Sequence, residues 1–262
     1  MLTVRIVLVT QEDPFYLPPA LDAFCRARRK DVVGLIILPA FNERLTATAG
    51  RLYAFYGPWD FLRLGMRYAG AIVANRLNGL RPITRPYSAH DVARRHGIPI
   101  HRPAKINAPE FIEVLRTTIR PDLLVSIAAS QILRKGVLQT PPLGCINLHS
   151  APLPRYQGMM PNFWTMVEGE REAAVTVHYM VERLDAGDIV LQRAVPILPG
   201  DSLHDLMVRS KVVGVAALLE AVDQIERGTV AARPMDATRA TYFSFPKRAD
   251  AQRLRRMGRA LL

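Results

Sequence analysis

The stretch GCINLHSAPLPRYQG, residues 144–158, carries an asparagine and a histidine two positions apart at the end of an apolar run. In a β-strand, residues two apart point to the same face. Asn147 and His149 are therefore expected to project side by side, while Ile146 and Leu148 face the other way. Two prolines and a glycine follow, which indicates a rigid loop with a tight turn. The stretch predicts the end of a buried strand that opens into a cleft.

Alternating strand and helix patterns lead up to this stretch. VRIVLVT (4–10) and VVGLIILP (32–39) are typical of strands buried on both faces, and residues 17–30 between them have helical spacing. Helix followed by strand recurs in 88–101 and again in 108–149. Units of this length predict a parallel sheet. We therefore expect an α/β fold: a Rossmann-like, mainly parallel sheet with helices on both faces.

The chain beyond the motif adds two strands and a helix. Residues 173–197 alternate as two strands around the turn ERLDAGD, and residues 202–228 have the apolar spacing of a helix. The turn holds Asp185 and Asp188. Ordinary turn chemistry explains Asp188, which leaves Asp185 as the more interesting carboxylate.

Two common nucleotide-binding loops are absent from the sequence. The first strand is followed by TQEDPFYLPP, without a Gly-x-Gly-x-x-Gly, and no Gly-rich loop ends in Lys-Ser or Lys-Thr. The sequence thus argues against a dehydrogenase or a kinase, although the sheet is of the doubly wound type.

Composition indicates a globular cytoplasmic protein. The chain has 262 residues, of which 49% are hydrophobic, and no apolar run reaches the roughly 18 residues of a transmembrane segment. Its start has too short an apolar stretch for a secretory signal. The two cysteines, Cys25 and Cys145, have no metal-ligand spacing around them, so we expect buried thiols in a reducing compartment and no metal.

The formal net charge of +12 is concentrated in two regions. Residues 60–106 have nine basic against two acidic residues, and residues 247–262 have six against one. Solvated helix faces can explain such an excess. The alternative is a surface that attracts an anionic substrate such as a phosphate, a nucleotide-sugar or RNA.

Residues 41–82 are too long for a simple connection and too apolar for a disordered linker. We interpret them as a helical insertion with exposed aromatic residues, which covers the site, forms a homodimer or touches a membrane, with a dimer or lid favoured over a membrane. The insertion belongs to a catalytic domain of residues 1–200. Residues 201–262 are expected to form a C-terminal helix and a short basic tail packed on the same domain.

Asn147, His149 and Asp185 together suggest acid–base chemistry. Taken singly, each has an ordinary structural explanation. Together they offer a neutral hydrogen-bond donor, a group that titrates near neutrality and a carboxylate to orient it. No serine or cysteine elbow accompanies them. The set suits direct acyl transfer to an amine better than hydrolysis through a covalent intermediate.

Residues 145–192 resemble the core of the folate-dependent formyltransferases, which include glycinamide ribonucleotide, methionyl-tRNA and sugar N-formyltransferases. The shared pattern is Asn-x-His, then Leu-Pro and Gly, then a Leu-Asp-x-Gly turn 36 residues after the histidine. The similarity covers 88–200 closely and the first strand–helix–strand unit more loosely. One departure is Ala151, where most relatives have serine; Ser150 lies beside it.

The resemblance implies a role for each matching position. The catalytic residues would be Asn147, His149 and Asp185, with 10-formyltetrahydrofolate as the formyl donor and no metal. The residues expected to bind the folate are Ile132, Leu133, Val137, Val181, Leu184, Ala186 and Gly187. The loop after the histidine is expected to contact the acceptor substrate through Ser150, Pro152, Tyr156 and Gly158.

The acceptor is the least determined part of the prediction. Methionyl-tRNA formyltransferases continue into a β-barrel of about a hundred residues, for which the 65 residues after Ile197 leave no room. We therefore expect a small anionic amine, an amino group on a nucleotide-linked sugar, without an obligatory nucleic acid partner. A tRNA-directed enzyme, a glycinamide ribonucleotide formyltransferase, a formyltetrahydrofolate hydrolase and a non-catalytic folate-binding relative remain alternatives.

Overall fold

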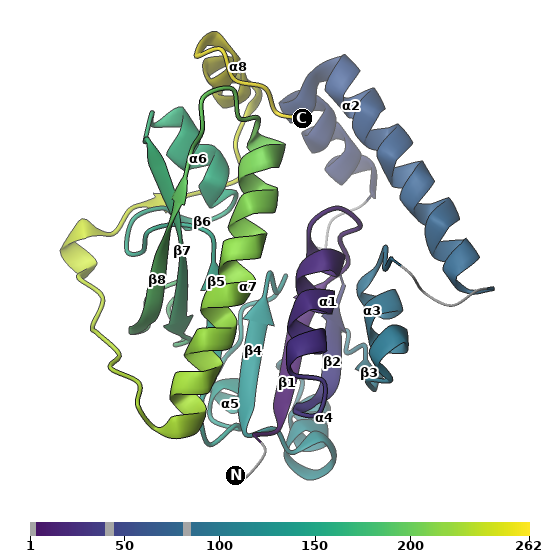
Figure 1. Cartoon of the computed structure of the whole chain (residues 1–262), viewed down its shortest axis with the longest axis vertical. Helices are drawn as coiled ribbons and strands as arrows, with labels where there is room; N and C mark the ends of the chain where they lie inside the picture. The colour runs from purple at the N-terminus through teal and green to yellow at the C-terminus, as the bar shows by residue number, and fades with distance from the viewer. Residues whose placement is uncertain (1–3, 40–44, 81–84) are drawn as a thin grey trace.

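One mainly parallel sheet organises the protein, whose computed structural model describes residues 4–39, 45–80 and 85–262. Within those residues it has seven strands in the order β3-β2-β1-β4-β5-β7-β8 (Figure 1). Neighbours from β3 to β5 pair in parallel, while β7 and β8 are antiparallel. The strands are β1 (Ile6–Gln11), β2 (Val32–Leu38), β3 (Ile100–His101), β4 (Leu123–Ile127), β5 (Cys145–His149), β7 (Glu172–Tyr179) and β8 (Ile189–Pro196). This architecture confirms the predicted α/β fold.

Helices cover both faces of the sheet because its central strands are apolar on both faces. Ile6 and Leu8 of β1 pack into one core, and Val7 and Val9 into the other. The first core is closed by α1 (Leu17–Ala27), α3 (Ala89–His96) and α7 (Leu203–Arg227); the second by α4 (Pro109–Val114), a π-helical turn (Leu115–Ile119) and α5 (Lys135–Leu138). The helix predicted over 17–30 ends three residues early, at Ala27.

The strand order places an opening at the carboxyl ends of the parallel strands. The chain leaves β1 to form β2 and β3 on one side, and later returns to add β4 and β5 on the other. Such a reversal leaves a crevice beyond the ends of the strands, where ligands of open α/β sheets bind. The quoted motif lies at this edge, because β5 ends at His149.

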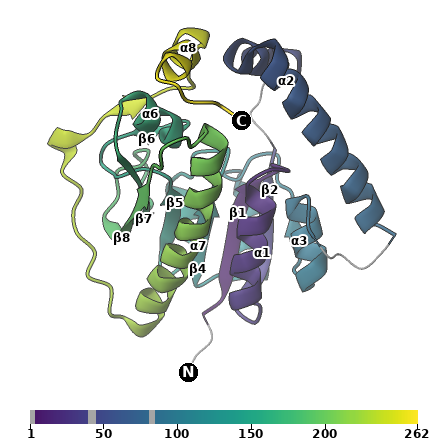
Figure 2. The same ribbon diagram turned by 45° about the horizontal axis from the view of Figure 1, so that its top comes forward.

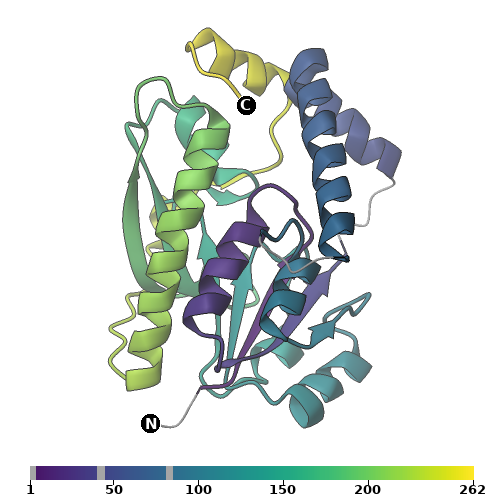
Figure 3. The same cartoon turned by 45° about the vertical axis from the view of Figure 1, so that its right-hand side comes forward.

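The predicted helical insertion is α2 (Leu45–Asn78), which consists of two helical segments. They meet at Gly57, whose φ of 75° and following proline break the helix. The first segment is anchored by Phe55, which packs edge-on against Phe163 and Phe245. The second segment lies along the outside of the molecule (Figure 3). The ends of the predicted insertion, 41–44 and 81–82, lie outside the described residues.

The C-terminal part of the chain returns to the site edge after α7. It forms β9 (Tyr242–Phe243), which pairs in parallel with β6 (Gln157–Gly158) in the loop after the motif. A 3-10 turn (Ala237–Arg239) precedes β9, and α8 (Arg248–Arg256) follows it. The predicted short basic tail is thus partly helical, and α8 lies beside the kinked end of α2 (Figure 2). The loop after the motif leads into α6 (Pro161–Val167).

Candidate active site

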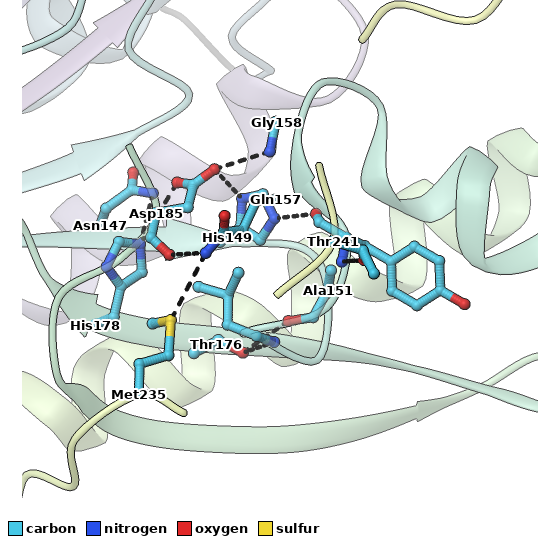
Figure 4. Close-up of polar contacts among 12 residues, drawn as sticks. Asn147, His149, Ala151, Gln157, Gly158, Thr176, His178, Asp185, Met235 and Thr241 are labelled. Carbon is cyan, nitrogen blue, oxygen red and sulfur yellow. Dashed lines mark hydrogen bonds and ion pairs between the residues drawn. The ribbon is translucent and has the colours of Figure 1, made fainter. Parts of the chain in front are cut away.

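A cavity of about 590 Å³ opens at the carboxyl ends of β1, β4 and β5. Its size is within the usual range for small-molecule sites. Asn147, His149 and Asp185 all line it. The structure therefore brings the three residues together around one opening, although Asp185 comes from a turn far along the sequence (Figure 4).

Pairing of β5 with β7 determines which side chains meet at this opening. Asn147 lies opposite His178, and His149 opposite Thr176, in the antiparallel register. On the other side of β5, Asn147 pairs with Ser126 of β4, which also lines the cavity. The polar residues at this edge therefore come from three adjacent strands, and the rest of β5 stays apolar and buried.

His149 is buried, with 6% of its surface exposed, and both of its ring nitrogens face oxygens. Nε2 lies 2.8 Å from the carbonyl oxygen of Tyr156 and must donate to it, since a carbonyl can only accept. Nδ1 lies 3.7 Å from Oδ2 of Asp185, an ion-pair distance rather than a hydrogen bond. The motif loop and Asp185 therefore hold the His149 ring between them.

His178 is the neutral neighbour of this pair. Its Nδ1 lies 2.8 Å from the carbonyl oxygen of Tyr179 and donates to it, so Nε2 of the neutral ring is an acceptor. Nε2 receives the Asn147 amide at 3.2 Å. Burial lowers the pKa of His178 to about 4, although the Asp185 carboxylate, 3.8 Å from Nε2, acts in the opposite direction. His178 is thus uncharged near neutral pH.

Asp185 is held in an unusual backbone conformation by its neighbours. Its φ is 49°, in the left-handed region that aspartate tolerates better than most residues. Oδ2 accepts the backbone N–H of Gly158 at 3.0 Å, and its carbonyl accepts Nε2 of Gln157 at 2.9 Å. The motif loop therefore fixes both the carboxylate and the main chain of Asp185.

Two glycines allow these loops to approach so closely. A Cβ on Gly187 would lie 2.0 Å from the carbonyl oxygen of Tyr179, and one on Gly158 would lie 2.2 Å from that of Phe243. Gly158 also has a φ of 96°. A larger residue at either position would displace the backbone that carries Asp185.

The predicted folate-binding residues divide into two groups. Ile132, Leu133, Val181 and Leu184 line the cavity, whereas Val137, Ala186 and Gly187 do not. Val137 instead packs into the second core, because the short helix α5 points it beneath the sheet. Gly187 is buried against the carbonyl of Tyr179, which leaves it no surface on the cavity.

The predicted acceptor-binding residues also divide. Ser150 and Gly158 line the cavity, but Pro152 and Tyr156 do not. The left-handed backbone of Tyr156, with φ of 61°, directs its ring away to stack on Phe243 and to bond Glu170. Its carbonyl is what serves the site, by holding His149. At the departure from the family pattern, Ala151 is fully buried and its carbonyl accepts Oγ1 of Thr176 at 2.6 Å.

Sequence reasoning missed three charged residues that line the cavity. Asp13 follows β1, Arg51 comes from α2, and Lys211 comes from α7. Burial raises the pKa of Asp13 and lowers that of Lys211, while the charge of each partly offsets the shift of the other. Arg51 stacks over the ring of Phe245 at 4.7 Å. The sequence feature that could have indicated a buried functional lysine at Lys211 is its position inside the apolar run SKVVGV.

His178 and Gln157 were also missed. Alternation along β7 places His178 on one face with Thr176, and pairing β7 with β5 would have put it beside Asn147. Gln157 gave no comparable signal, since its partner is a main-chain carbonyl. Within residues 4–39, 45–80 and 85–262, no three His, Cys, Asp or Glu side chains are grouped as a metal site would require.

The chain is similar in sequence to known formyltransferases. A family model described as formyl transferase matches residues 73–222. The methionyl-tRNA formyltransferase of Trichlorobacter lovleyi is 40% identical over 157 residues, which cover 60% of this chain and 49% of that protein. A second, from Geotalea uraniireducens, is 38% identical over 67% of this chain and 56% of its own. This chain therefore spans about half the length of the curated relatives it matches.

Solved structures share the fold at low sequence identity. Glycinamide ribonucleotide transformylase 1 of Symbiobacterium toebii superposes with a TM-score of 0.61 at 20% identity, covering 89% of this chain and 95% of that one. An N-formyltransferase of Helicobacter canadensis, in complex with folinic acid and dTDP-3-aminofucose, superposes with a TM-score of 0.57 at 16% identity, over 92% and 71%.

Proposed function

This chain belongs to the formyl transferase family, and we propose that it transfers a formyl group from 10-formyltetrahydrofolate to a primary amine of a small molecule. The observation that carries the proposal is the convergence of Asn147, His149 and Asp185 on one cavity. An amide donor, an imidazole and a carboxylate are the groups that attack of an amine on a formyl carbon requires.

In this proposal Asn147 and His149 stabilise the negative charge that develops on the formyl oxygen. The amide of Asn147 is oriented by its bond to His178, and both side chains line the same cavity. Preorganised donors of this kind typically contribute about 3–4 kcal/mol each to the transition state. No covalent intermediate on the protein is required.

Asp185 would orient His149 and help to pass the proton that the attacking amine loses to the departing folate nitrogen. Its carboxylate lies 3.7 Å from Nδ1 of His149 and 3.8 Å from Nε2 of His178, between the two rings. It is also buried, with 8% exposed, so its charge acts at close range with little screening by solvent. His178 acts as a positioning residue, because its neutral ring fixes the Asn147 amide.

Several apolar residues that line the cavity suit a folate. Ile132, Val181 and Leu184 are apolar yet 41–52% exposed there, so a flat ring system could cover them. The segments that carry them, 128–133 and 180–185, would hold the ring with main-chain groups. When bound, the donor supplies the activated formyl carbon.

We further propose that the acceptor is an anionic amine, specifically an amino group on a nucleotide-linked sugar. Arg51 and Lys211 line the cavity together with the acid Asp13. A phosphate-bearing substrate would find both cations there. The Helicobacter canadensis enzyme, which shares the fold, was crystallised with a substrate of this class.

A tRNA-directed formyltransferase is the second candidate, and the sequence comparison favours it. The most similar curated proteins we describe are methionyl-tRNA formyltransferases, and the chain carries a net charge of +12. Binding of aminoacylated tRNA would weaken steeply with salt, as the release of counterions requires. The binding of a small amine substrate would depend much less on the salt concentration.

A panel of acceptors separates these candidates. The chain is incubated with 10-formyltetrahydrofolate and, separately, with amino-sugar nucleotides, glycinamide ribonucleotide and methionyl-tRNA, and the deformylated folate is followed spectroscopically. We expect turnover with an amino-sugar nucleotide. Turnover with methionyl-tRNA alone would reverse the assignment of the acceptor, and formate release without any amine would identify a hydrolase.

A further inference from the structure

The second segment of α2 presents an apolar stripe on its outward side. Its members are Trp59, Leu62, Met66, Val73 and Leu77, which are between 50% and 76% exposed. Their spacing of three, four or seven residues puts them on one side of a helix, along about 30 Å. We call this stripe the outer face of α2. Apolar residues gathered on one exposed side of a helix mark an interaction site, whereas single exposed apolar residues need no such explanation.

The opposite side of the same segment is fixed to the protein. Ala71 and Asn78 are buried, and Nδ2 of Asn78 donates to Oδ2 of Asp91 at 2.6 Å and to the carbonyl of Arg85 at 2.9 Å. Asp91 is fully buried at the start of α3. These bonds determine which side of the helix faces inward, so the outer face of α2 points away from the body of the protein. The ribbon of this segment runs along the edge of the molecule in Figures 1 and 3.

Positive charge borders this stripe. At about 100° per residue, Arg63 and Arg76 lie on opposite sides of it. Residues 45–80 hold four arginines against one aspartate, and residues 247–259, which include α8, hold six basic residues against one acidic. These two regions are in contact and account for +8 of the formal charge of +12. Arg51 lines the active-site cavity, so the charge beside the stripe comes from Arg63, Arg76 and the neighbouring basic residues of α8.

We propose that the outer face of α2 docks onto an anionic lipid bilayer, with the helix lying in the plane of the interface. Apolar residues including a tryptophan on one side, flanked by arginines, are the features of interfacial helices. Arginine side chains can reach the lipid headgroups while the apolar residues enter the acyl boundary. No helix of the described residues is long and apolar enough to cross a membrane.

Charge favours a bilayer over a second copy of the chain as the occupant. A second copy of the chain is the alternative occupant of an exposed apolar face, since interfaces between proteins typically bury about 800 Å² on each partner. Two copies would, however, bring together surfaces that each carry a large positive excess, and like charges across an interface oppose association. An anionic membrane is complementary to the same charge.

Tryptophan fluorescence and vesicle flotation test the proposal. The chain has two tryptophans, and Trp164 is buried with Nε1 bonded to the carbonyl of Ser244, whereas Trp59 is 76% exposed. With vesicles of phosphatidylcholine containing 30% phosphatidylglycerol, we expect flotation of the full chain and a blue shift that the Trp59→Phe variant lacks. Vesicles of phosphatidylcholine alone should bind it far more weakly.

Substitutions separate the apolar and the charged contributions. Leu62→Gln with Val73→Gln should weaken binding by about tenfold or more, because both side chains leave the apolar boundary. Arg63→Gln and Arg76→Gln should each weaken it roughly fivefold at low salt. Val212→Gln is the matched control: Val212 is 68% exposed on α7, outside the outer face of α2, and its substitution should change nothing.

Each result of the vesicle-binding experiments either supports or overturns the proposed membrane contact. Flotation that depends on anionic lipid and on the outer face of α2 supports the proposal. Failure to bind anionic vesicles would overturn it. In that case, sedimentation as a dimer that becomes a monomer in the Leu62→Gln, Val73→Gln variant would assign the face to a second copy. Equal loss of binding in Val212→Gln would also overturn it.

Discussion

The amide nitrogen of Asn147 lies 3.2 Å from Nε2 of His178, on the neighbouring antiparallel strand. The opposite ring nitrogen of His178 donates to the Tyr179 carbonyl, so Nε2 can only accept while the ring is neutral. One histidine thus fixes the orientation of the amide, and the other, His149, faces the Asp185 carboxylate. The two histidines have different environments and therefore different tasks.

Removing either proposed oxyanion donor should abolish most of the activity. Asn147→Ala and His149→Ala are expected to lower turnover by roughly 100-fold or more, since each removes a preorganised donor. The measurement is the rate of deformylation of the folate donor with a saturating amine. Circular dichroism and thermal unfolding confirm that the variants fold, and a folded His149→Ala variant with wild-type turnover would refute its role.

The Asp185→Asn substitution removes the charge of the carboxylate while it keeps the size and shape of the side chain. Asparagine tolerates the left-handed backbone at this position, so the turn should persist while the carboxylate charge is lost. We expect kcat to fall about 100-fold with little change in the KM for the folate. The matched control is Asp188→Asn, three residues along the same turn and exposed to solvent, which should keep full activity. Equal effects of the two substitutions would contradict the assignment.

His178 should make the protein less stable in mild acid. Its folded pKa of about 4 lies below the usual 6.5, so the unfolded chain takes up a proton first as the pH falls. The stability that His178 contributes is complete above pH 6.5 and is lost progressively toward pH 4, on the order of 3 kcal/mol. Denaturant unfolding from pH 7 to 4 measures this loss, which should be smaller in His178→Gln. If the free energy of unfolding falls equally with pH in the wild-type chain and in His178→Gln, His178 is not a buried neutral histidine.

Gly187→Ala should disturb the turn that carries Asp185. Its new Cβ would lie 2.0 Å from the Tyr179 carbonyl oxygen, and such overpacking costs about 1–3 kcal/mol. Gly65→Ala provides the control, because a Cβ there meets nothing within 4 Å and alanine favours a helix by up to about 1 kcal/mol. Thermal unfolding measures the stability of the Gly187→Ala and Gly65→Ala variants. Similar stability in both variants would mean that the turn can relax.

Much of the fold could be predicted from periodicity. The strands of the sheet core are short apolar runs between helices, and Ser88 and Gly97 cap α3 as their residue types predict. The helical character of the insertion was also predictable. The pairing of β6 with β9 was not, because two-residue strands leave no pattern and their partners are 85 residues apart.

The site could be predicted only where side chains carry the chemistry. Asn147, His149 and Asp185 stand out by residue type and spacing. Pro152 and Tyr156 were predicted to contact the acceptor substrate, but the left-handed backbone at Tyr156 directs its ring elsewhere and leaves its carbonyl to hold His149. Contacts made by main-chain groups do not depend on residue type, so sequence offers little sign of them.

Formyl transfer at His149 is the central claim, and a comparison of two proteins tests it most directly. Wild-type and His149→Ala chains are each mixed with 10-formyltetrahydrofolate and the amine that the acceptor panel identifies, and the formylated amine is quantified by mass spectrometry over time. We predict product with the wild-type chain and about 100-fold slower formation with the variant. Equal rates in two folded proteins, or no formylated amine from any acceptor with the wild-type chain, would contradict the claim.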